Sequence, residues 1–289
     1  HCLMMMGQTQ HFYTSDKLSS NQITNICQDE AGYIWIGTEY GLNKYDGYSF
    51  TNYLYDKDNP ASISSNTISF LFCDSKGNLW VGTQKGLDCY DDANDQFRHI
   101  KMNGAKEVPR VNYIIEEDED HLLVGTAGYG LFRLDIKTWE TQLLQGYATA
   151  DHNYFSYIFI DEMGHFWKSG HGSTINHRLP DGKIEEFNSP YGTITGFLMY
   201  EGGVLMVGIH GLLYYRDGQM YDHYFDFGEL AGKDILFRTA MCDRQGNLFI
   251  GTMGNGLCWV PKGEHRMQRY EYQSASFDLS TSTVWALFE

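Results

Sequence analysis

A glycine-rich stretch, IWIGTEYGLNKYDG at residues 34–47, has the residue types of a ligand-binding loop. Glycine-rich loops bind phosphate when their backbone N–H groups open a helix, and a Walker loop carries Gly-Lys-Ser or Gly-Lys-Thr at that point. Here no such triplet follows, and the glycines separate short segments of strand-like composition. The stretch therefore predicts turns of a β meander and argues against a phosphate-binding loop.

Four aspartates are candidates for acid–base chemistry: Asp29, Asp74, Asp161 and Asp243. Hydrolysis of a glycosidic bond requires two carboxylates that face the same bond. Each of these aspartates instead begins an Asp-x-x-Gly segment at the same point of a repeated sequence, and such segments form tight turns. We therefore interpret them as turn residues and predict no catalytic residues in this chain.

The histidines and cysteines follow no spacing that is typical of a metal site. The histidines considered are His165, His171, His177 and His210. His171 and His210 occupy the same turn of neighbouring repeats, and none of the six cysteines forms a C-x-x-C pair. We expect no metal, no cofactor and buried free thiols.

Composition limits the partners of the chain. The 289 residues carry 21 basic and 37 acidic side chains, a net charge of −16, which disfavours binding to nucleic acid and to anionic lipid. Neutral ligands such as carbohydrates remain compatible with this surface. No run of 18 or more apolar residues occurs. Residues 1–8 contain a short apolar run, which we interpret as a signal-peptide remnant or a disordered start.

The chain is built from six copies of one segment. ITNICQDEAGYIWIGTEYGLNKYD, from Ile23, recurs as ISFLFCDSKGNLWVGTQKGLDCYD, from Ile68, and four less regular copies follow. The equivalent landmark positions are Gly37, Gly82, Gly125, Ser169, Gly208 and Gly251, at intervals of 45, 43, 44, 39 and 43 residues. A period near this length with strand-like content predicts an all-β fold, a β-propeller of four-stranded antiparallel blades.

The predicted blades span residues 22–54, 67–100, 110–143, 154–188, 193–226 and 237–273. Residues 282–289 resemble the first strand of a seventh repeat, and residues 9–14 resemble an outer strand. We therefore expect a seven-bladed type of propeller with six full blades and part of a seventh within residues 9–289. A six-bladed ring with an additional tail is the alternative.

The repeat D-x-x-G-x-[LI]-W-[IV]-G-T-x-x-G-L-x-x-[YL]-D resembles the two-component regulator propeller repeat, and residues 29–46 and 74–91 match it almost letter for letter. The resemblance extends to the periplasmic sensor region of hybrid two-component sensor histidine kinase/response regulators of Bacteroides-type gut bacteria. In that family, propellers and an immunoglobulin-like domain precede a membrane span, a histidine kinase, a receiver and a DNA-binding region. The family senses breakdown products of polysaccharides and regulates transcription of the loci that use them.

The resemblance implies a periplasmic part of an inner-membrane protein that senses carbohydrate, with kinase activity elsewhere in the full-length chain. Its expected partners are an oligosaccharide or other neutral small ligand, the following propeller and immunoglobulin-like domain, and a second copy in a homodimer. Two alternatives remain, an interaction or dimerisation scaffold of the same sensor and a carbohydrate-active propeller enzyme.

Candidate ligand-binding residues follow from the loops of such a blade. The turn between the second and third strands emerges on the same face as the connector to the next blade, and it varies in length between copies. Variable loops on a rigid scaffold are common binding sites. The turns supply Tyr40, Lys85, Tyr129, His171, His210 and Asn255, and the connectors supply Arg110, Asn112, Tyr154 and Arg238.

Overall fold

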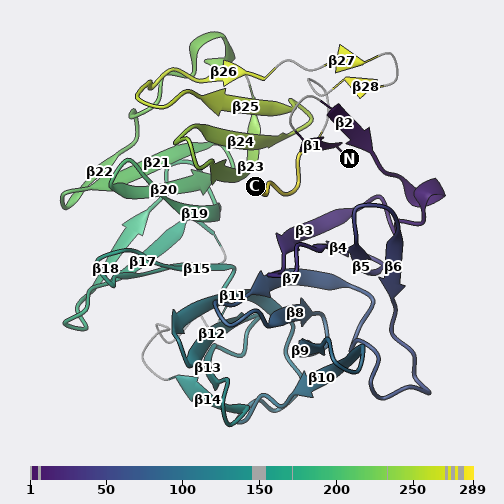
Figure 1. The fold of residues 1–289 in the computed structure, drawn as a ribbon. Coiled ribbons are helices and arrows are strands. Elements are labelled where there is room, and N and C mark those ends of the chain that lie inside the picture. Colours follow the sequence, from purple (N-terminus) through teal and green to yellow (C-terminus); the bar gives the residue numbers. More distant parts are fainter. Residues whose placement is uncertain are drawn as a thin grey trace. The chain divides into compact units, whose positions relative to one another are not determined.

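The computed structural model describes residues 2–5, 8–144, 154–170, 172–232, 234–270, 273–274, 277–278 and 283–289. Within these ranges the fold is all-β, and its main elements are six four-stranded antiparallel sheets (Figure 1). Two 3-10 turns, η1 (Thr14–Asp16) and η2 (Gly228–Leu230), are the helical elements of the described chain. The prediction of four-stranded antiparallel propeller blades is confirmed.

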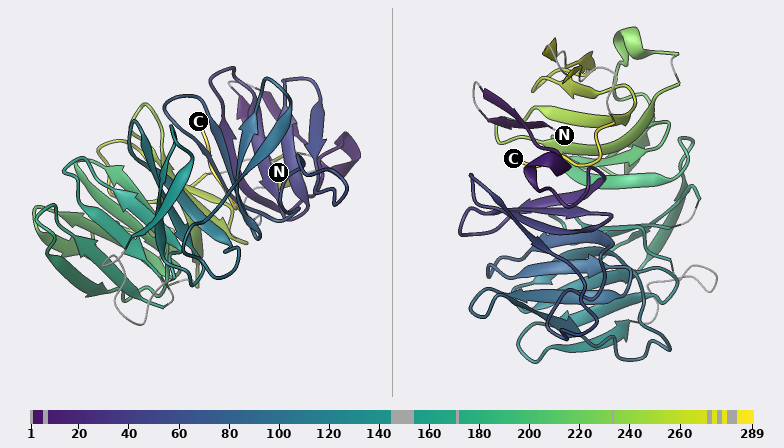
Figure 2. Two further views of the ribbon diagram at one scale, coloured as in Figure 1. Left: turned by 90° about the horizontal axis from the view of Figure 1, so that it is seen from below. Right: turned by 90° about the vertical axis from the view of Figure 1, so that its right-hand side faces the viewer.

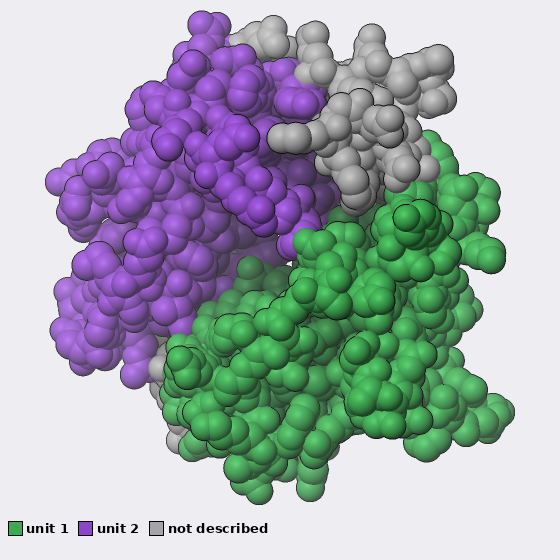
Figure 3. Space-filling view, viewed as in Figure 1, with its two compact units in different colours: residues 1–154 green, residues 155–289 purple. Residues whose placement is uncertain are grey.

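The chain divides into two compact units, residues 1–154 and residues 155–289 (Figure 3). Each unit contains three of the sheets. In every sheet the strands are hydrogen-bonded in chain order, as each meander in Figures 1 and 2 shows. The sheets of the first unit are β3–β6 (Ile23–Gln28, Ile34–Thr38, Gly41–Tyr45, Phe50–Tyr53), β7–β10 (Ile68–Cys73, Leu79–Thr83, Gly86–Asp91, Gln96–Ile100) and β11–β14 (Val111–Asp118, His121–Thr126, Leu131–Asp135, Glu140–Leu144). Those of the second unit are β15–β18 (Tyr157–Ile160, Phe166–Ser169, Thr174–Arg178, Ile184–Asn188), β19–β22 (Ile194–Tyr200, Gly203–Gly208, Gly211–Arg216, Gln219–Tyr221) and β23–β26 (Leu236–Cys242, Leu248–Met253, Leu257–Val260, Gln268–Arg269).

The expected seven-bladed type is wrong for the part of the chain that the structure describes, which forms six blades. Residues 283–289, expected as the first strand of a seventh blade, are assigned no strand, and no second strand lies beside them in the described ranges to complete a ladder. Near the N-terminus, β1 (Cys2–Met5) pairs with β2 (Gln8–His11). A second short pair, β27 (Gln273–Ser274) and β28 (Phe277–Asp278), follows the sixth blade. The expected role of residues 9–14 as an outer strand stays a prediction.

An aspartate at the end of the first strand organises the blades that carry tryptophan. In the first blade, the backbone N–H of Tyr33 donates to Asp29 Oδ1 at 2.9 Å, and the Trp35 indole N–H donates to Asp29 Oδ2 at 2.7 Å. The second blade repeats this arrangement with Asp74 and Trp80, whose indole bond is 2.8 Å long. Both indoles are fully buried, and a buried N–H without an acceptor is costly. The carboxylate therefore accepts hydrogen bonds from the backbone of the turn and from the buried indole at the same time.

The tryptophans pack between neighbouring blades, as their replacement by other apolar residues elsewhere in the repeat predicts. The Trp35 ring lies 4.8 Å from that of Tyr90 in the second blade, and the Trp80 ring lies 5.6 Å from that of Trp139 in the third. Each of the four largest apolar clusters likewise combines residues of two consecutive sheets. The core of this protein thus lies between blades within each unit.

Glycine at the landmark position allows the next blade to approach closely. A Cβ added at Gly37 would lie 2.7 Å from Cγ2 of Ile68, and one at Gly82 would lie 2.9 Å from Cγ1 of Val111. Ile68 and Val111 begin the first strands of the next sheets. Val284 makes the same approach to Gly251, and its N–H donates to the Thr252 carbonyl at 2.9 Å. Residues near Val284 therefore cover the sixth blade as the next first strand covers other blades.

Replacing Asp74 by alanine tests the turn aspartate. Asp74→Ala leaves the Trp80 indole and the Asn78 backbone N–H without their acceptor in a buried site, and we expect it to lower the free energy of unfolding by about 2–4 kcal/mol. Trp80→Phe keeps most of the packing and removes one bond, so about 1 kcal/mol is expected. Urea unfolding followed by tryptophan fluorescence and circular dichroism measures both. Equal effects of the two variants would contradict the central role of the carboxylate.

Candidate functional site

The threonine after the landmark glycine fixes the turn between the second and third strands. Thr38 Oγ1 donates to the Gly41 carbonyl at 2.9 Å and accepts the Tyr40 N–H at 3.0 Å. Thr83 makes the corresponding pair of bonds with Gly86 and Lys85, at 3.1 and 3.0 Å. The backbone of the turn is thereby held without using the side chains of the residues at its tip.

Turns and connectors of the first unit form one surface, which we call the loop face. It comprises residues 39–40, 54–67, 84–85, 101–110 and 127–130. Backbone bonds join its parts: Gly41 donates to Asn66 at 2.6 Å, and Ala127 donates to Arg110 at 3.0 Å. Turns and connectors therefore lie on one face, as expected from the meander.

The loop face exposes large apolar side chains. The exposed members are Tyr40, Leu54, Tyr55 and Val108. Leu54 lies against Gly41, and Val108 lies against Gly86, so each connector covers part of a turn. A rigid surface with exposed aromatic rings is suited to stacking against a flat apolar ligand surface.

Polar side chains accompany these rings. The Lys85 ammonium lies 5.6 Å from the centroid of the Tyr55 ring, and the Tyr129 hydroxyl donates to Glu107 at 3.2 Å. Burial and the bond to Glu107 raise the pKa of Tyr129, so the hydroxyl stays a neutral donor. The loop face thus combines aromatic surface with a cation, a hydroxyl and a carboxylate.

The structure places three further candidates of the first unit beside these turns. Arg110 is exposed and precedes β11. Asn112, expected in a connector, lies in β11 at a register shift between Val111 and Tyr113, because a β-bulge interrupts this strand. Tyr154 forms an isolated bridge with Ala127.

The candidates of the second unit are described separately. His210 is exposed, and its Nδ1 lies 3.9 Å from Asp234. The Asn255 N–H donates to Thr252 Oγ1 at 3.1 Å, as in the turns of the first unit. Arg238, also expected in a connector, lies at the bulge of β23 with its guanidinium 4.8 Å from the Trp285 ring centroid. His171 lies outside the described residues.

Sequence reasoning missed the connector residues of the loop face, Leu54, Tyr55, Glu107 and Val108. These residues belong to the connectors between consecutive sheets, which vary in sequence and follow no repeat. The available signal was connector length: 14 residues separate β6 from β7, and 10 separate β10 from β11. Segments of this length must run over the face of the blade and contribute surface there.

The opposite ends of these blades contain a cavity of about 410 Å³. Its lining includes Asp29, Glu30, Tyr90, Arg98 and Trp139. The Arg98 guanidinium lies 4.1 Å from the Trp139 ring centroid, and Trp139 has φ +64°, an unusual backbone conformation for a large residue. Asp29 is already engaged by the Tyr33 backbone and the Trp35 indole. Several polar groups of this cavity therefore serve the fold.

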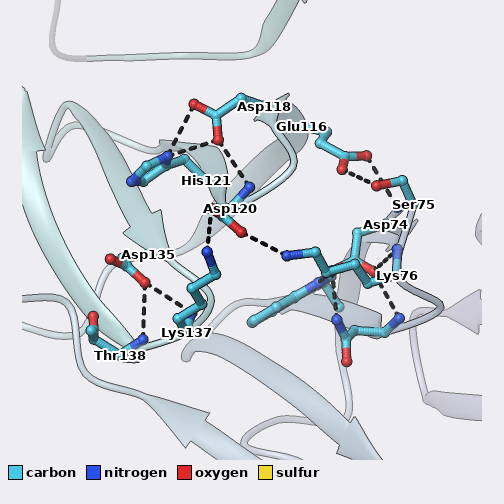
Figure 4. A network of polar contacts seen from close by, with 12 residues as sticks. Asp74, Ser75, Lys76, Glu116, Asp118, Asp120, His121, Asp135, Lys137 and Thr138 are labelled. Carbon is cyan, nitrogen blue, oxygen red and sulfur yellow. Dashed lines mark hydrogen bonds and ion pairs between the residues drawn. The ribbon is translucent and has the colours of Figure 1, made fainter.

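Ion pairs connect the second and third blades at the same ends (Figure 4). Asp120 accepts from Lys76 at 2.7 Å and from Lys137 at 2.5 Å, and these two bonds lower its pKa to about 2. Glu116 accepts from the Ser75 hydroxyl and from its N–H. The acidic run 116–120 lies in strand β11 up to Asp118 and bonds to the neighbouring blade.

A fully buried carboxylate bonds to a half-exposed histidine in the second blade, Asp88 with His99. Asp88 is fully buried and lies 2.6 Å from His99 Nδ1, while His99 Nε2 lies 2.9 Å from the Pro60 carbonyl. Because both ring nitrogens face acceptors, the charged imidazolium is favoured, and the bond to Asp88 raises the pKa of His99. The first blade has Asn43 and Asn52 at these positions, with a bond of 2.6 Å, so the pair is one version of a structural contact.

Lys168 and His177 are buried in the interior of the fourth blade. Lys168 replaces the apolar residue of other repeats, and burial lowers its pKa to about 8. His177 stacks on Trp167 with ring centroids 3.7 Å apart, and burial together with His165 lowers its pKa. In the described ranges, no three metal-ligating side chains converge on one point.

Comparison with known proteins supports the repeat assignment. The family model for the two component regulator propeller matches residues 17–40 and 62–85, which contain the first two turn aspartates. These two segments are two-component regulator propeller repeats. A 52-residue segment is also 40% identical to histidine kinase P4 of Formosa agariphila, covering 18% of this chain and 4% of that protein.

Solved structures resemble these propeller repeats in fold. The extracellular domain of a hybrid two component system from B. thetaiotaomicron matches with a TM-score of 0.80 at 20% identity, covering 97% of this chain and 39% of that one. A second such domain from the same organism matches with a TM-score of 0.76 at 17% identity, covering 93% and 38%. The chain thus spans about two fifths of the length of these neighbours.

None of the helical segments within the described residues has the length and apolar character needed to cross a membrane.

The Asp88–His99 pair predicts a defined pH dependence of stability. The folded-state pKa of His99 is raised, so its contribution is complete below the unfolded value of about 6.5 and is lost as pH rises through the folded value. The double variant Asp88→Asn/His99→Asn copies the first blade and lacks this titration. As the pH is raised from about 6 to about 8.5, we expect the melting temperature of the wild type to decrease relative to that of the variant.

Thermal unfolding of both proteins across this pH range measures the effect, and all other histidines cancel in the difference. Parallel pH profiles of the two proteins would show that His99 does not gain its charge from Asp88.

Proposed function

We propose that this chain is the extracytoplasmic sensor segment of a hybrid two-component signalling protein and that it binds oligosaccharides released from polysaccharides. The observation that carries the proposal is the run of two-component regulator propeller repeats in a fold that matches, over 97% of the chain, a hybrid-system extracellular domain. The histidine kinase, the membrane anchor and the DNA-binding part belong to the rest of the full-length protein in this proposal. The segment itself is not an enzyme.

The surface of the first unit supports a neutral carbohydrate as ligand. Tyr40 is 58% exposed at the tip of a turn whose backbone is fixed by Thr38. Aromatic rings stack on the apolar faces of sugars, and Lys85, Tyr129 and Glu107 supply hydrogen-bonding groups on the same loop face. The net charge of −16 disfavours strongly anionic ligands. His210, Asn255 and Arg238 are the corresponding candidates of the second unit.

Signalling requires that the ligand bind two states of the receptor with different affinities. In this proposal, ligand on the loop face alters the contact with the following propeller and immunoglobulin-like domain, or the geometry of a homodimer. An interaction scaffold without a ligand of its own is the alternative, and it differs in having no affinity for sugars.

Isothermal titration calorimetry against defined oligosaccharides tests the proposal. We expect one oligosaccharide to release heat on binding to the wild type, and Tyr40→Ala to weaken this binding about tenfold through loss of a stacking partner. Tyr48→Ala is the matched control, because Tyr48 is 95% exposed in the same blade but lies in the turn between the third and fourth strands. It should bind as the wild type does.

Trp139→Gly separates the loop face from the cavity at the other ends of the blades. Glycine tolerates the positive φ of this position, so the variant removes the indole without adding backbone strain. Loss of binding in Trp139→Gly with normal binding in Tyr40→Ala would move the site to the cavity. No heat with any oligosaccharide would favour the scaffold, and release of a cleaved product would contradict the non-enzymatic assignment.

A further inference from the structure

Two cysteines of neighbouring blades meet in the first unit. Cys27 Sγ lies 3.2 Å from Cys73 Sγ, although 46 positions separate them in the sequence. An S–S bond is about 2.05 Å long, so the two sulfurs must approach each other by about 1 Å to form it. Among the described residues with a free thiol, these are the two whose sulfurs contact each other.

The fold holds both sulfurs at the same level of the blades. Cys27 lies near the end of β3, Cys73 ends β7, and these first strands belong to consecutive sheets. Each strand leads directly into its Asp-x-x-Gly turn, at Asp29 and at Asp74. Because hydrogen bonds fix both turns, the cysteines stay together as long as the two blades are folded.

We propose that Cys27 and Cys73 form a disulfide bond that joins the first and second blades. The oxidant is a disulfide, either a small molecule such as glutathione disulfide or a thiol–disulfide exchange protein. The proposal does not depend on the sensor function, because it rests on the contact between the two sulfurs.

Exposure assigns the order of the exchange. Cys73 is partly exposed, whereas Cys27 is 8% exposed, so the donor disulfide meets Cys73 first. The Cys73 thiolate attacks one sulfur of the donor, and the other half of the donor leaves as a thiol. The Cys27 sulfur then attacks Cys73 in this mixed disulfide, and the second half leaves. Two protons and two electrons pass from the cysteines to the donor, which ends as two thiols.

The neighbouring thiol also explains why Cys27 does not react first. The contact with Cys73 and burial raise the pKa of Cys27, and a protonated thiol is a poor nucleophile. Once Cys73 is part of a mixed disulfide it is no longer a thiol, so its effect on the pKa of Cys27 ends, and Cys27 can then attack the Cys73 sulfur.

A bond at this point would stabilise the ends of the blades that carry the turn aspartates. It would close a loop that contains the whole of the first blade after β3, and such a bond restricts the unfolded chain. It would also tie together the two turns whose residues Asp29, Glu30 and Asn78 line the cavity.

Thiol labelling tests the proposal. The reduced chain is exposed to glutathione disulfide and then unfolded, and its free thiols are labelled with iodoacetamide and counted by mass spectrometry. Peptide digestion of the protein without reduction then identifies the linked cysteines. The chain has six cysteines, so loss of one pair leaves four labels. We expect a linked peptide pair that contains Cys27 and Cys73, and a melting temperature that is several degrees higher than that of the reduced chain.

Single variants identify the pair and its order. Cys27→Ser should trap glutathione on Cys73, whereas Cys73→Ser should leave Cys27 with its free thiol. Both should lose the redox dependence of the melting temperature. Cys242→Ser is the matched control, because Cys242 ends β23 immediately before Asp243, as Cys73 ends β7 before Asp74, and it should keep the linked peptide.

A wild type that keeps both thiols free under these conditions, or a linked peptide that joins other cysteines, would overturn the proposal. The proposal would also be overturned if the linked peptide forms but the oxidised and reduced wild type have equal melting temperatures, as expected of Cys27→Ser. The bond would then not join folded blades.

Discussion

One carboxylate joins the turn, the core and the blade contact in this protein. Asp29 Oδ1 accepts a backbone N–H and closes the turn between the first two strands, and Oδ2 accepts the indole N–H of Trp35. The indole can then be buried between two blades with no unsatisfied donor. A charged acceptor makes a strong bond, and so a small turn residue controls the position of a large core residue.

Other blades of the same chain satisfy this requirement in different ways. In the sixth blade Phe249 replaces the tryptophan, and Asp243 Oδ2 keeps the bond from the Asn247 side chain at 2.8 Å, which Asn78 and Asp74 also make in the second blade. In the fifth blade Met206 needs no acceptor, and the Asp-x-x-Gly turn is replaced by a tight turn at Glu201 and Gly202. Aspartate is therefore present where a side-chain N–H must be satisfied. The repeat is preserved as a set of hydrogen bonds, and the residues vary within it.

Much of the fold could be predicted because the repeat is visible in the sequence. Threonine and aspartate in the repeat each have a local physical reason, which the structure shows at Thr38 and Asp29. Glycine at the landmark position gives the next blade room to approach, as at Gly37. The number of blades was wrong, since the resemblance of residues 282–289 to a first strand did not supply the strands that must pair with it. A repeat predicts the geometry of one blade better than the number of blades.

The candidate site was less predictable, because its residues come from segments that do not repeat. Tyr40 and Lys85 could be found as the variable positions of a regular turn, whereas Tyr55 and Val108 belong to connectors whose course is decided by tertiary contacts. Asn112 and Arg238 were placed in connectors but lie at β-bulges, and a bulge has no clear signal in one sequence. The contact of Cys27 with Cys73 was also missed, because it depends on how two blades pack and not on a local pattern in the sequence.

The two ends of a blade in the first unit differ in how they use their polar side chains. At the Asp-x-x-Gly end, side chains such as Asp74, Lys76 and Asp120 bond to the turn or to the next blade, so substitution there disturbs the fold. On the loop face, Thr38 and Thr83 hold the turns through backbone groups, and the tips at Tyr40 and Lys85 are left free of this task. Residues at the tips can therefore change without cost to the blade. A scaffold with this division of roles can acquire new binding specificity on one face while the hydrogen bonds of the other face keep the blades in place.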